Sequence, residues 1–160
     1  MKKFINIILN IELYFNKGDD FMYRENAIFD VSFKNQDECF DFLVDQAFKT
    51  GLVSEKDSIK DELIKREKIM STALLPPFAI PHAKSSNVLE TSLIFLRLKE
   101  EIDWDGSMVK VVIALFSKDG DVHISLLANL SRKLVDAEFR DFCLNASEDE
   151  VFEKIQELGE

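Results

Sequence analysis

The sequence predicts an α/β fold: a single domain in which helices sandwich a mixed β-sheet of about four to five strands. Three observations favour this architecture. The chain has 160 residues, of which 46% are hydrophobic and 31% charged, as expected for one domain with a sizeable core. Apolar residues recur at helical spacing near both ends of the chain, and short apolar runs lie between them. No repeat or Pro/Gly/Ser-rich linker divides the chain after residue 22.

Two helices are expected before the strands. Apolar residues at helical spacing predict a helix over residues 36–50, which Gly51 would end. A second helix is expected over residues 58–70, with Ser58 as its N-cap. Its apolar stripe consists of Ile59, Leu63 and Ile64. Each helix therefore has one face suited to packing on a sheet.

Three apolar runs in the middle of the chain predict strands. The run over residues 78–82 is expected to end as a strand at Pro81, because proline cannot donate to the ladder, so that His82 lies at a strand-to-loop junction. Residues 91–98 form a second strand. Residues 109–116 are almost continuously apolar, which predicts a strand covered on both faces. Asp105 and Gly106 indicate a turn between these two longer strands.

Helical spacing returns in the last third of the chain. A helix is expected from about residue 121, with Asp121 as its N-cap, and a shorter one around residues 139–143. Ser147 and Glu150 have the spacing of a capping box at the start of the last helix.

The first 21 residues are expected to be a non-native or disordered extension, and residues 22–160 to form the domain. Residues 4–15 are mostly apolar, but Asn and Glu interrupt this run, it is too short to span a bilayer, and no cleavage site of small residues follows it. Codons for Lys17 and Gly18 can match the core of a ribosome-binding site, and Met22 follows closely. We therefore expect Met22 to be the natural start.

Charge and cysteine content narrow the class of protein. The net charge of −10 disfavours nucleic acid and anionic membranes as main partners, and no direct membrane insertion is expected. The acidity suits docking onto a basic protein, or serves solubility alone. Cys39 and Cys143 lie among apolar neighbours and outside any C-x-x-C pattern. Both are therefore expected to be reduced core thiols in the cytoplasm.

His82 is the main candidate for chemistry. The chain has only two histidines, His82 and His123, and it has no glycine-rich loop for a nucleotide. Pro81 restrains the backbone before His82, and a neutral imidazole, with an ordinary pKa near 6.5, is a competent nucleophile at cell pH. The alternative is a partly buried imidazole with a structural role. Two distant histidines and two isolated cysteines lack zinc-finger spacing, so no metal is expected.

Groups that could bind a phosphoryl group surround His82 in the sequence. Phosphoryl transfer needs a nucleophile held in line and donors for the phosphoryl oxygens. The guanidinium of Arg66 can bridge two oxygens, and Ser71 and Thr72 offer hydroxyls. His123 lies in the first turn of a predicted helix, where free N–H groups favour an anion. The alternatives are a solvated arginine and hydroxyls that form caps or turns.

Four ordered segments carry a family resemblance. The stretch R-E-K-I-M-S-T at residues 66–72, followed by A-I-P-H-A at 79–83, resembles the RE…ST…AIPH signature of fructose/mannitol (type 2) IIA domains of bacterial phosphoenolpyruvate-dependent sugar phosphotransferase systems. Residues 102–106, 123–130 and 146–150 resemble three further segments of that family. The family usually has glycines between ST and AIPH, whereas residues 73–78 contain two prolines and no glycine.

The resemblance implies that His82 is the phosphorylated histidine, that His123 supports the phosphoryl group and that Arg66 is the basic residue near the site. Such a domain accepts phosphate from the phosphocarrier HPr and passes it to a IIB component, and so to a sugar that enters through the IIC permease, with no cofactor. A regulatory IIA-like switch of the nitrogen-regulatory type, which controls a partner without sugar transport, shares this chemistry. A degenerate domain with structural histidines is a third interpretation.

Overall fold

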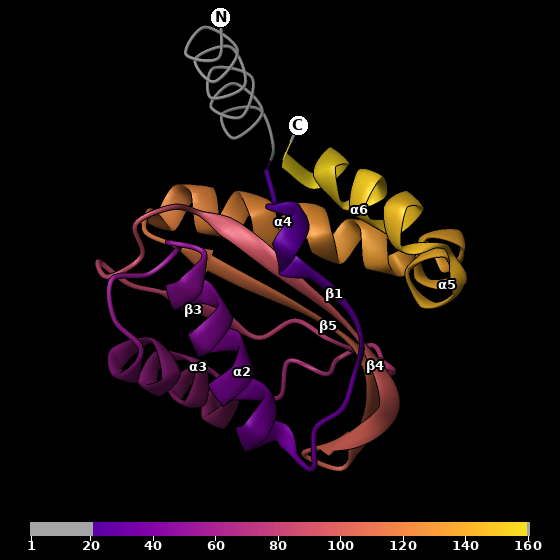
Figure 1. The fold of residues 1–160 in the computed structure, drawn as a ribbon, viewed down its shortest axis with the longest axis horizontal. Coiled ribbons are helices and arrows are strands. Elements are labelled where there is room, and N and C mark those ends of the chain that lie inside the picture. Colours follow the sequence, from indigo (N-terminus) through magenta and orange to yellow (C-terminus); the bar gives the residue numbers. More distant parts are fainter. Residues whose placement is uncertain (1–20, 160) are drawn as a thin grey trace, which may run out of the picture.

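The structure, a computed structural model, describes residues 21–159 (Figure 1). The expected extension over residues 1–21 lies outside the described residues, except for Phe21, so its nature and the start at Met22 stay predictions. The elements in chain order are η1 (Arg24–Asn26), β1 (Ala27–Val31), α2 (Gln36–Lys49), α3 (Asp57–Ile69), β2 (Phe78–Ala79), β3 (His82–Lys84), β4 (Ser92–Trp104), β5 (Ser107–Ser117), α4 (Gly120–Val135), α5 (Ala137–Asn145), α6 (Glu148–Gln156) and η2 (Glu157–Gly159).

The five strands form one mixed sheet, which confirms the predicted fold class. The strand order is β1-β4-β5-β2, and β3 also pairs with β5. Strands β4 and β5 are antiparallel, whereas the other pairs are parallel. Asp105 and Gly106 join β4 to β5, and both have positive φ, 53° and 95°. Glycine adopts such a φ without strain, so the Asp-Gly pair makes a tight hairpin from two strands that are longer than predicted.

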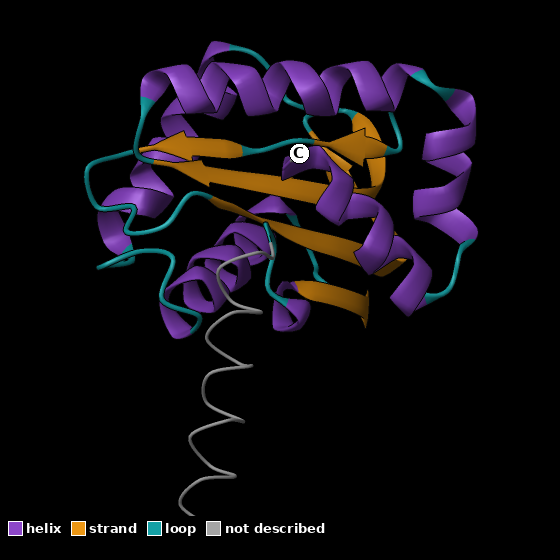
Figure 2. Ribbon diagram, turned by 90° about the horizontal axis from the view of Figure 1, so that it is seen from above, coloured by secondary structure: helices purple, strands orange, loops and turns teal. Residues whose placement is uncertain are grey.

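Helices cover both faces of the sheet (Figure 2). Successive residues of a strand point to opposite faces. Ile94 and Leu96 of β4 therefore pack with the buried residues of α2 and α3, while Leu93 and Phe95 pack with those of α4, α5 and α6. Strand β5 divides its side chains in the same way, which confirms that it is covered on both faces.

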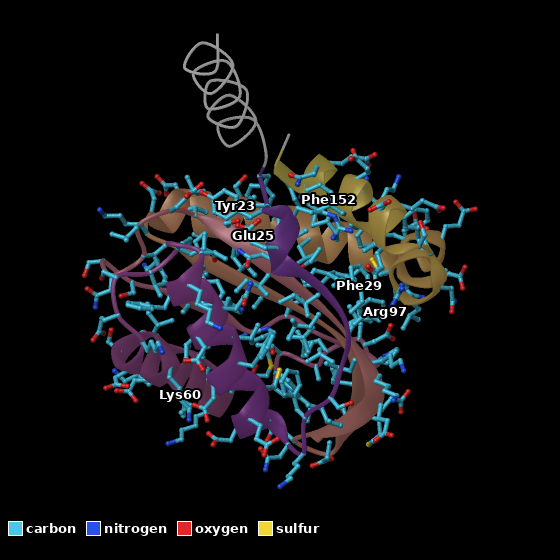
Figure 3. All side chains as sticks on the ribbon, viewed as in Figure 1. Tyr23, Glu25, Phe29, Lys60, Arg97 and Phe152 are labelled. Atoms are coloured by element: carbon cyan, nitrogen blue, oxygen red, sulfur yellow. The ribbon has the colours of Figure 1, made fainter. Side chains whose placement is uncertain are left out.

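Strand β1 was not predicted from the sequence. It forms the parallel edge next to β4, and its register shifts between Phe29 and Val31, where Asp30 has a φ of 56°. This irregularity interrupts the alternation that marks a strand. The Arg97 guanidinium lies 4.7 Å from the centre of the Phe29 ring (Figure 3), on the face that Arg97 shares with Phe95.

The helix starts differ in part from the predictions. Helix α3 begins at Asp57, and the Glu55 carboxylate accepts the Ser58 N–H at 3.0 Å. The prediction that Ser58 is the N-cap is therefore wrong; its hydroxyl accepts from the Asn87 amide at 2.9 Å. Ser147 caps α6 as predicted, by accepting the N–H of Glu150 at 3.3 Å.

Both cysteines are free and buried, one in each apolar layer, as predicted. Burial raises the pKa of the Cys39 thiol above its ordinary value, and it raises the pKa of Cys143 to about 12. A thiol with so high a pKa stays protonated at neutral pH and is a poor nucleophile. The cysteines are therefore packing residues.

Candidate functional site

His82 is held at the edge of the sheet by a break between two short strands. The predicted strand over residues 78–82 is in fact two strands, β2 and β3, which both pair with β5. They are separated at Ile80 and Pro81, because proline has no N–H for the ladder. His82 therefore begins β3 rather than following a strand end, with Leu115 of β5 as its partner. Only 9% of its surface is exposed.

Two hydrogen bonds define the state of the His82 ring. Its Nδ1 lies 2.8 Å from the carbonyl oxygen of Ile80, and its Nε2 accepts from Nε of Arg66 at 3.0 Å. Because a carbonyl only accepts and a guanidinium only donates, Nδ1 carries the proton and Nε2 carries the lone pair. Burial lowers the pKa of His82 below 6.5; the Ile80 carbonyl opposes this shift, and the Arg66 charge adds to it. The ring is therefore neutral at cell pH.

His123 faces His82 from the start of α4. Their ring centres are 5.1 Å apart, and Nδ1 of His123 is hydrogen-bonded to the hydroxyl of Ser117. The pKa of His123 falls to about 4, chiefly through burial and then through the nearby charges. The predicted N-cap of α4 is wrong: Asp119, not Asp121, caps the helix and accepts the Asp121 N–H at 2.7 Å.

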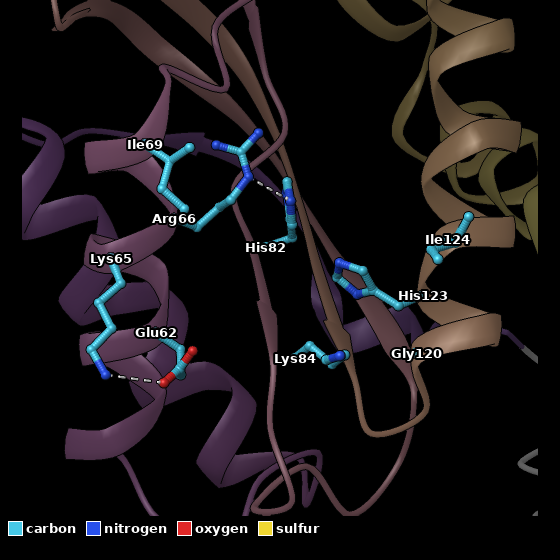
Figure 4. Close-up of a pocket in the computed structure, with 9 residues that line it drawn as sticks. All are labelled: Glu62, Lys65, Arg66, Ile69, His82, Lys84, Gly120, His123 and Ile124. Atoms are coloured by element: carbon cyan, nitrogen blue, oxygen red, sulfur yellow. Dashed lines mark hydrogen bonds and ion pairs between the residues drawn. The ribbon is translucent and has the colours of Figure 1, made fainter.

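Arg66 completes the group of predicted residues that the structure brings together. It lies in the last turn of α3, where its Nη1 donates to the carbonyl of Met70 at 2.7 Å. Together with both histidines it faces an open pocket of about 480 Å³ (Figure 4). The other pocket residues are Glu62, Lys65, Ile69, Lys84, Gly120 and Ile124. Two oppositely placed helices, α3 and α4, thus frame one nucleophile.

Lys84 is a cation of the pocket that sequence reasoning missed. It lies two residues after His82 on β3, and residues at this spacing share one face of a strand. A Cβ at position 120 would lie 3.5 Å from Nζ of Lys84, so the Lys84 ammonium lies against the start of α4. The alternation of strand residues after A-I-P-H was the signal that could have identified Lys84.

Ser71 and Thr72, predicted to bind the phosphoryl group, do not line the pocket that holds His82. The Ser71 hydroxyl accepts the N–H of Ala73 at 3.1 Å and faces a second pocket, on the other side of α3. Thr72 is buried, and its hydroxyl donates to the carboxylate of Glu67. Their role as phosphoryl ligands stays a prediction, and these contacts do not favour it.

Within residues 21–159 no group of three or more histidine, cysteine or acidic side chains has the geometry to hold a metal ion. No helix of this described part is long and apolar enough to cross a membrane.

The sequence pattern of the family "Phosphoenolpyruvate-dependent sugar phosphotransferase system, EIIA 2" matches residues 20–158, and the chain belongs to this family. It is 29% identical over 137 residues to the mannitol-specific phosphotransferase enzyme IIA component of Staphylococcus aureus, which covers 84% of this chain and 93% of that protein.

A larger relative contains a similar region. The multiphosphoryl transfer protein of Escherichia coli O6:H1 is 30% identical over 120 residues, which is 72% of this chain. The chain spans only 14% of the length of that protein.

Solved structures share the fold. The nitrogen regulatory protein IIA-Ntr of Neisseria meningitidis superposes with a TM-score of 0.74 at 20% identity, over 86% of this chain and 95% of that one. The mannitol IIA enzyme of Escherichia coli, solved in complex with phosphorylated mannitol IIB enzyme, gives a TM-score of 0.67 at 24% identity, over 80% and 92% of the two chains. At these identities the likeness shows the fold alone.

Proposed function

We propose that the chain is a cytoplasmic phosphoryl carrier of a sugar phosphotransferase system, which accepts phosphate from phospho-HPr on His82 and passes it to a IIB component for sugar uptake. The observation that carries this proposal is the pair of hydrogen bonds on the His82 ring. They leave the lone pair on Nε2, beside Arg66 in an open pocket.

Phosphoryl transfer to His82 requires only the groups of the donor protein and of this pocket. The Nε2 lone pair of His82 forms a bond to phosphorus, the bond from phosphorus to the donor atom breaks, and that electron pair stays with the donor protein. The proton stays on Nδ1, hydrogen-bonded to the Ile80 carbonyl oxygen, and this bond stabilises the positive charge that develops in the ring. The Arg66 Nε–H, which donates to Nε2 of His82 before transfer, then donates to a phosphoryl oxygen. A guanidinium binds such an oxygen strongly.

Two further groups would stabilise the phosphoryl oxygens. The ammonium group of Lys84 adds a positive charge to the pocket wall. The Ser117 hydroxyl can donate to Nδ1 of His123, which places the proton on Nε2 of His123 as a donor for a phosphoryl oxygen. Because the pKa of His123 is about 4, this ring donates as a neutral imidazole.

The rim of the pocket suits a protein partner. Ile69 of α3 is 81% exposed and Ile124 of α4 is 67% exposed, and both line the pocket on opposite sides of His82. Exposed apolar residues beside a reactive group are typical of a docking surface. HPr and IIB would bind this face in turn, and IIC would receive the phosphoryl group through IIB.

The test is phosphorylation by phospho-HPr. Wild-type protein is expected to acquire acid-labile, base-stable phosphate, whereas His82→Ala is expected to acquire none because the nucleophile is lost. His123→Ala is the matched control, since it removes the other imidazole and keeps Nε2 of His82. Full labelling of His82→Ala would overturn the proposal. Stable phosphate on His82 that no IIB protein accepts would favour a regulatory switch.

A further inference from the structure

A buried carboxylate lies directly behind the proposed active site. Glu67 is 8% exposed, and its carboxylate accepts from the N–H of Thr72 at 3.0 Å, from the Thr72 hydroxyl and from Nε1 of Trp104 at 3.3 Å. Trp104 is fully buried against the edge of the Phe40 ring. Within residues 21–159 this carboxylate forms no ion pair. A buried carboxylate needs hydrogen-bond donors in place of water, and these three neutral groups supply them.

Glu67 is next to Arg66 in the sequence, but the two side chains point in different directions and have different hydrogen-bond partners. Adjacent residues of a helix point about 100° apart, because a turn contains about 3.6 residues. Arg66 therefore reaches His82, while Glu67 points towards Trp104, at the end of β4. The Glu67 carboxylate fastens the end of α3 to the β4–β5 hairpin and to the segment that follows the helix.

Two paths connect Glu67 to the His82 ring, one through hydrogen bonds and one through the backbone of α3. The Thr72 carbonyl accepts the N–H of Ile80 at 3.2 Å, and the Ile80 carbonyl accepts Nδ1–H of His82 at 2.8 Å. In the other direction, the helix leads from Glu67 to Arg66, which donates to Nε2 of His82. Glu67 is thus connected to both nitrogens of the His82 ring, and Thr72 is part of the path to Nδ1.

We propose that Glu67, Thr72 and Trp104 are positioning residues, which hold the Ile80 carbonyl and the Arg66 guanidinium on opposite sides of the His82 ring and so keep the proton on Nδ1 and the lone pair on Nε2. This inference rests on the proposed function of His82. Without the Glu67 carboxylate, Thr72 is no longer hydrogen-bonded to the end of α3, so the positions of both become less defined. The ring then exchanges between its two tautomers, and only part of the population presents a lone pair to the pocket.

Glu67→Met and Glu67→Gln form the first test pair. Methionine has a similar length but removes both acceptors; the amide of glutamine can still accept from Thr72 N–H and donate to its hydroxyl. We expect the kcat for phosphorylation by phospho-HPr to fall about 10- to 100-fold in Glu67→Met, as small misplacements of reacting groups do, and about threefold or less in Glu67→Gln. The KM for phospho-HPr is expected to stay unchanged, because Glu67 lies outside the pocket rim.

Thr72→Val and Thr72→Ser form a second pair, which decides the matter if Glu67→Met does not fold. Valine removes only the hydroxyl, so kcat is expected to fall several-fold, and serine is expected to restore it. Thr50→Val is the matched control. It removes a hydroxyl that donates to the Gln46 carbonyl at 2.8 Å at the end of α2, away from the site, so it is expected to lower the melting temperature without changing kcat.

A spectroscopic readout separates positioning from stability. The side-chain 15N shifts of His82 are expected to report a proton on Nδ1 in the wild-type protein and a mixture of tautomers in Glu67→Met or Thr72→Val. Unchanged tautomer and kcat in these folded variants would overturn the inference, and so would a change confined to KM. If His82→Ala still abolished labelling, the proposed function would survive that result.

Discussion

The two helices that frame the pocket hold their functional residues very differently. On the α3 side, Arg66 donates to two acceptors, and the buried carboxylate of Glu67 anchors the adjacent backbone. On the α4 side, the ring of His123 is hydrogen-bonded to Ser117, and the first buried residue of the helix is Leu130. The α3 side thus supplies the packed contacts to the His82 ring, while the start of α4 is lightly packed, and exposed apolar residues lie on both helices.

Removing Arg66 is expected to have the largest effect among the supporting residues. Arg66→Ala should slow single-turnover phosphorylation by phospho-HPr by about 100-fold, the usual cost of losing a donor to a developing oxyanion. Arg66→Lys should recover little of this rate, because lysine lacks the planar guanidinium, whose separate N–H groups donate to two acceptors at once. A wild-type rate in Arg66→Ala would show that the packed side does not govern the chemistry.

Removing His123 should have a smaller and different effect. His123→Ala is expected to slow transfer from the phosphorylated chain to a IIB protein by about tenfold, which corresponds to one hydrogen bond to a charged group. The rate of labelling by phospho-HPr should change less. Measuring both half-reactions with the same preparation tests this division, and a loss of labelling as complete as that of His82→Ala would contradict it.

The dependence on pH should be the smallest effect. Protonation removes the nucleophilic lone pair, so the rate falls when the pH drops through the pKa of His82, which burial holds below 6.5. An imidazole with the ordinary pKa would lose about fourfold in its neutral fraction between pH 7.5 and 6.0. Because burial lowers the pKa of His82, the labelling rate of the wild-type chain should fall by less than this factor over the same range. A fourfold fall, with phospho-HPr shown to be intact, would mean that the ring is not shielded.

The sequence was informative wherever a local pattern determines structure. Helical spacing and apolar runs predicted the layered fold. The candidate site residues from the sequence included Arg66, His82 and His123, which meet in the pocket, but not Lys84. Strand β1 was not predicted, because Asp30, with its positive φ, interrupts the alternation of apolar and polar residues. The contact of Thr72 with Glu67 was not predicted, because the surroundings of Glu67 can be recognised only once Trp104, 37 residues further along, is known to lie beside it.

The most direct test of the account is the position of the phosphoryl group on the His82 ring. Long-range 1H–15N NMR spectra of the phosphorylated, histidine-labelled protein distinguish the two nitrogens. Because the Ile80 carbonyl holds the proton on Nδ1, we expect the phosphoryl group on Nε2 of His82. Phosphate on Nδ1 of His82, or on any other residue, would contradict it.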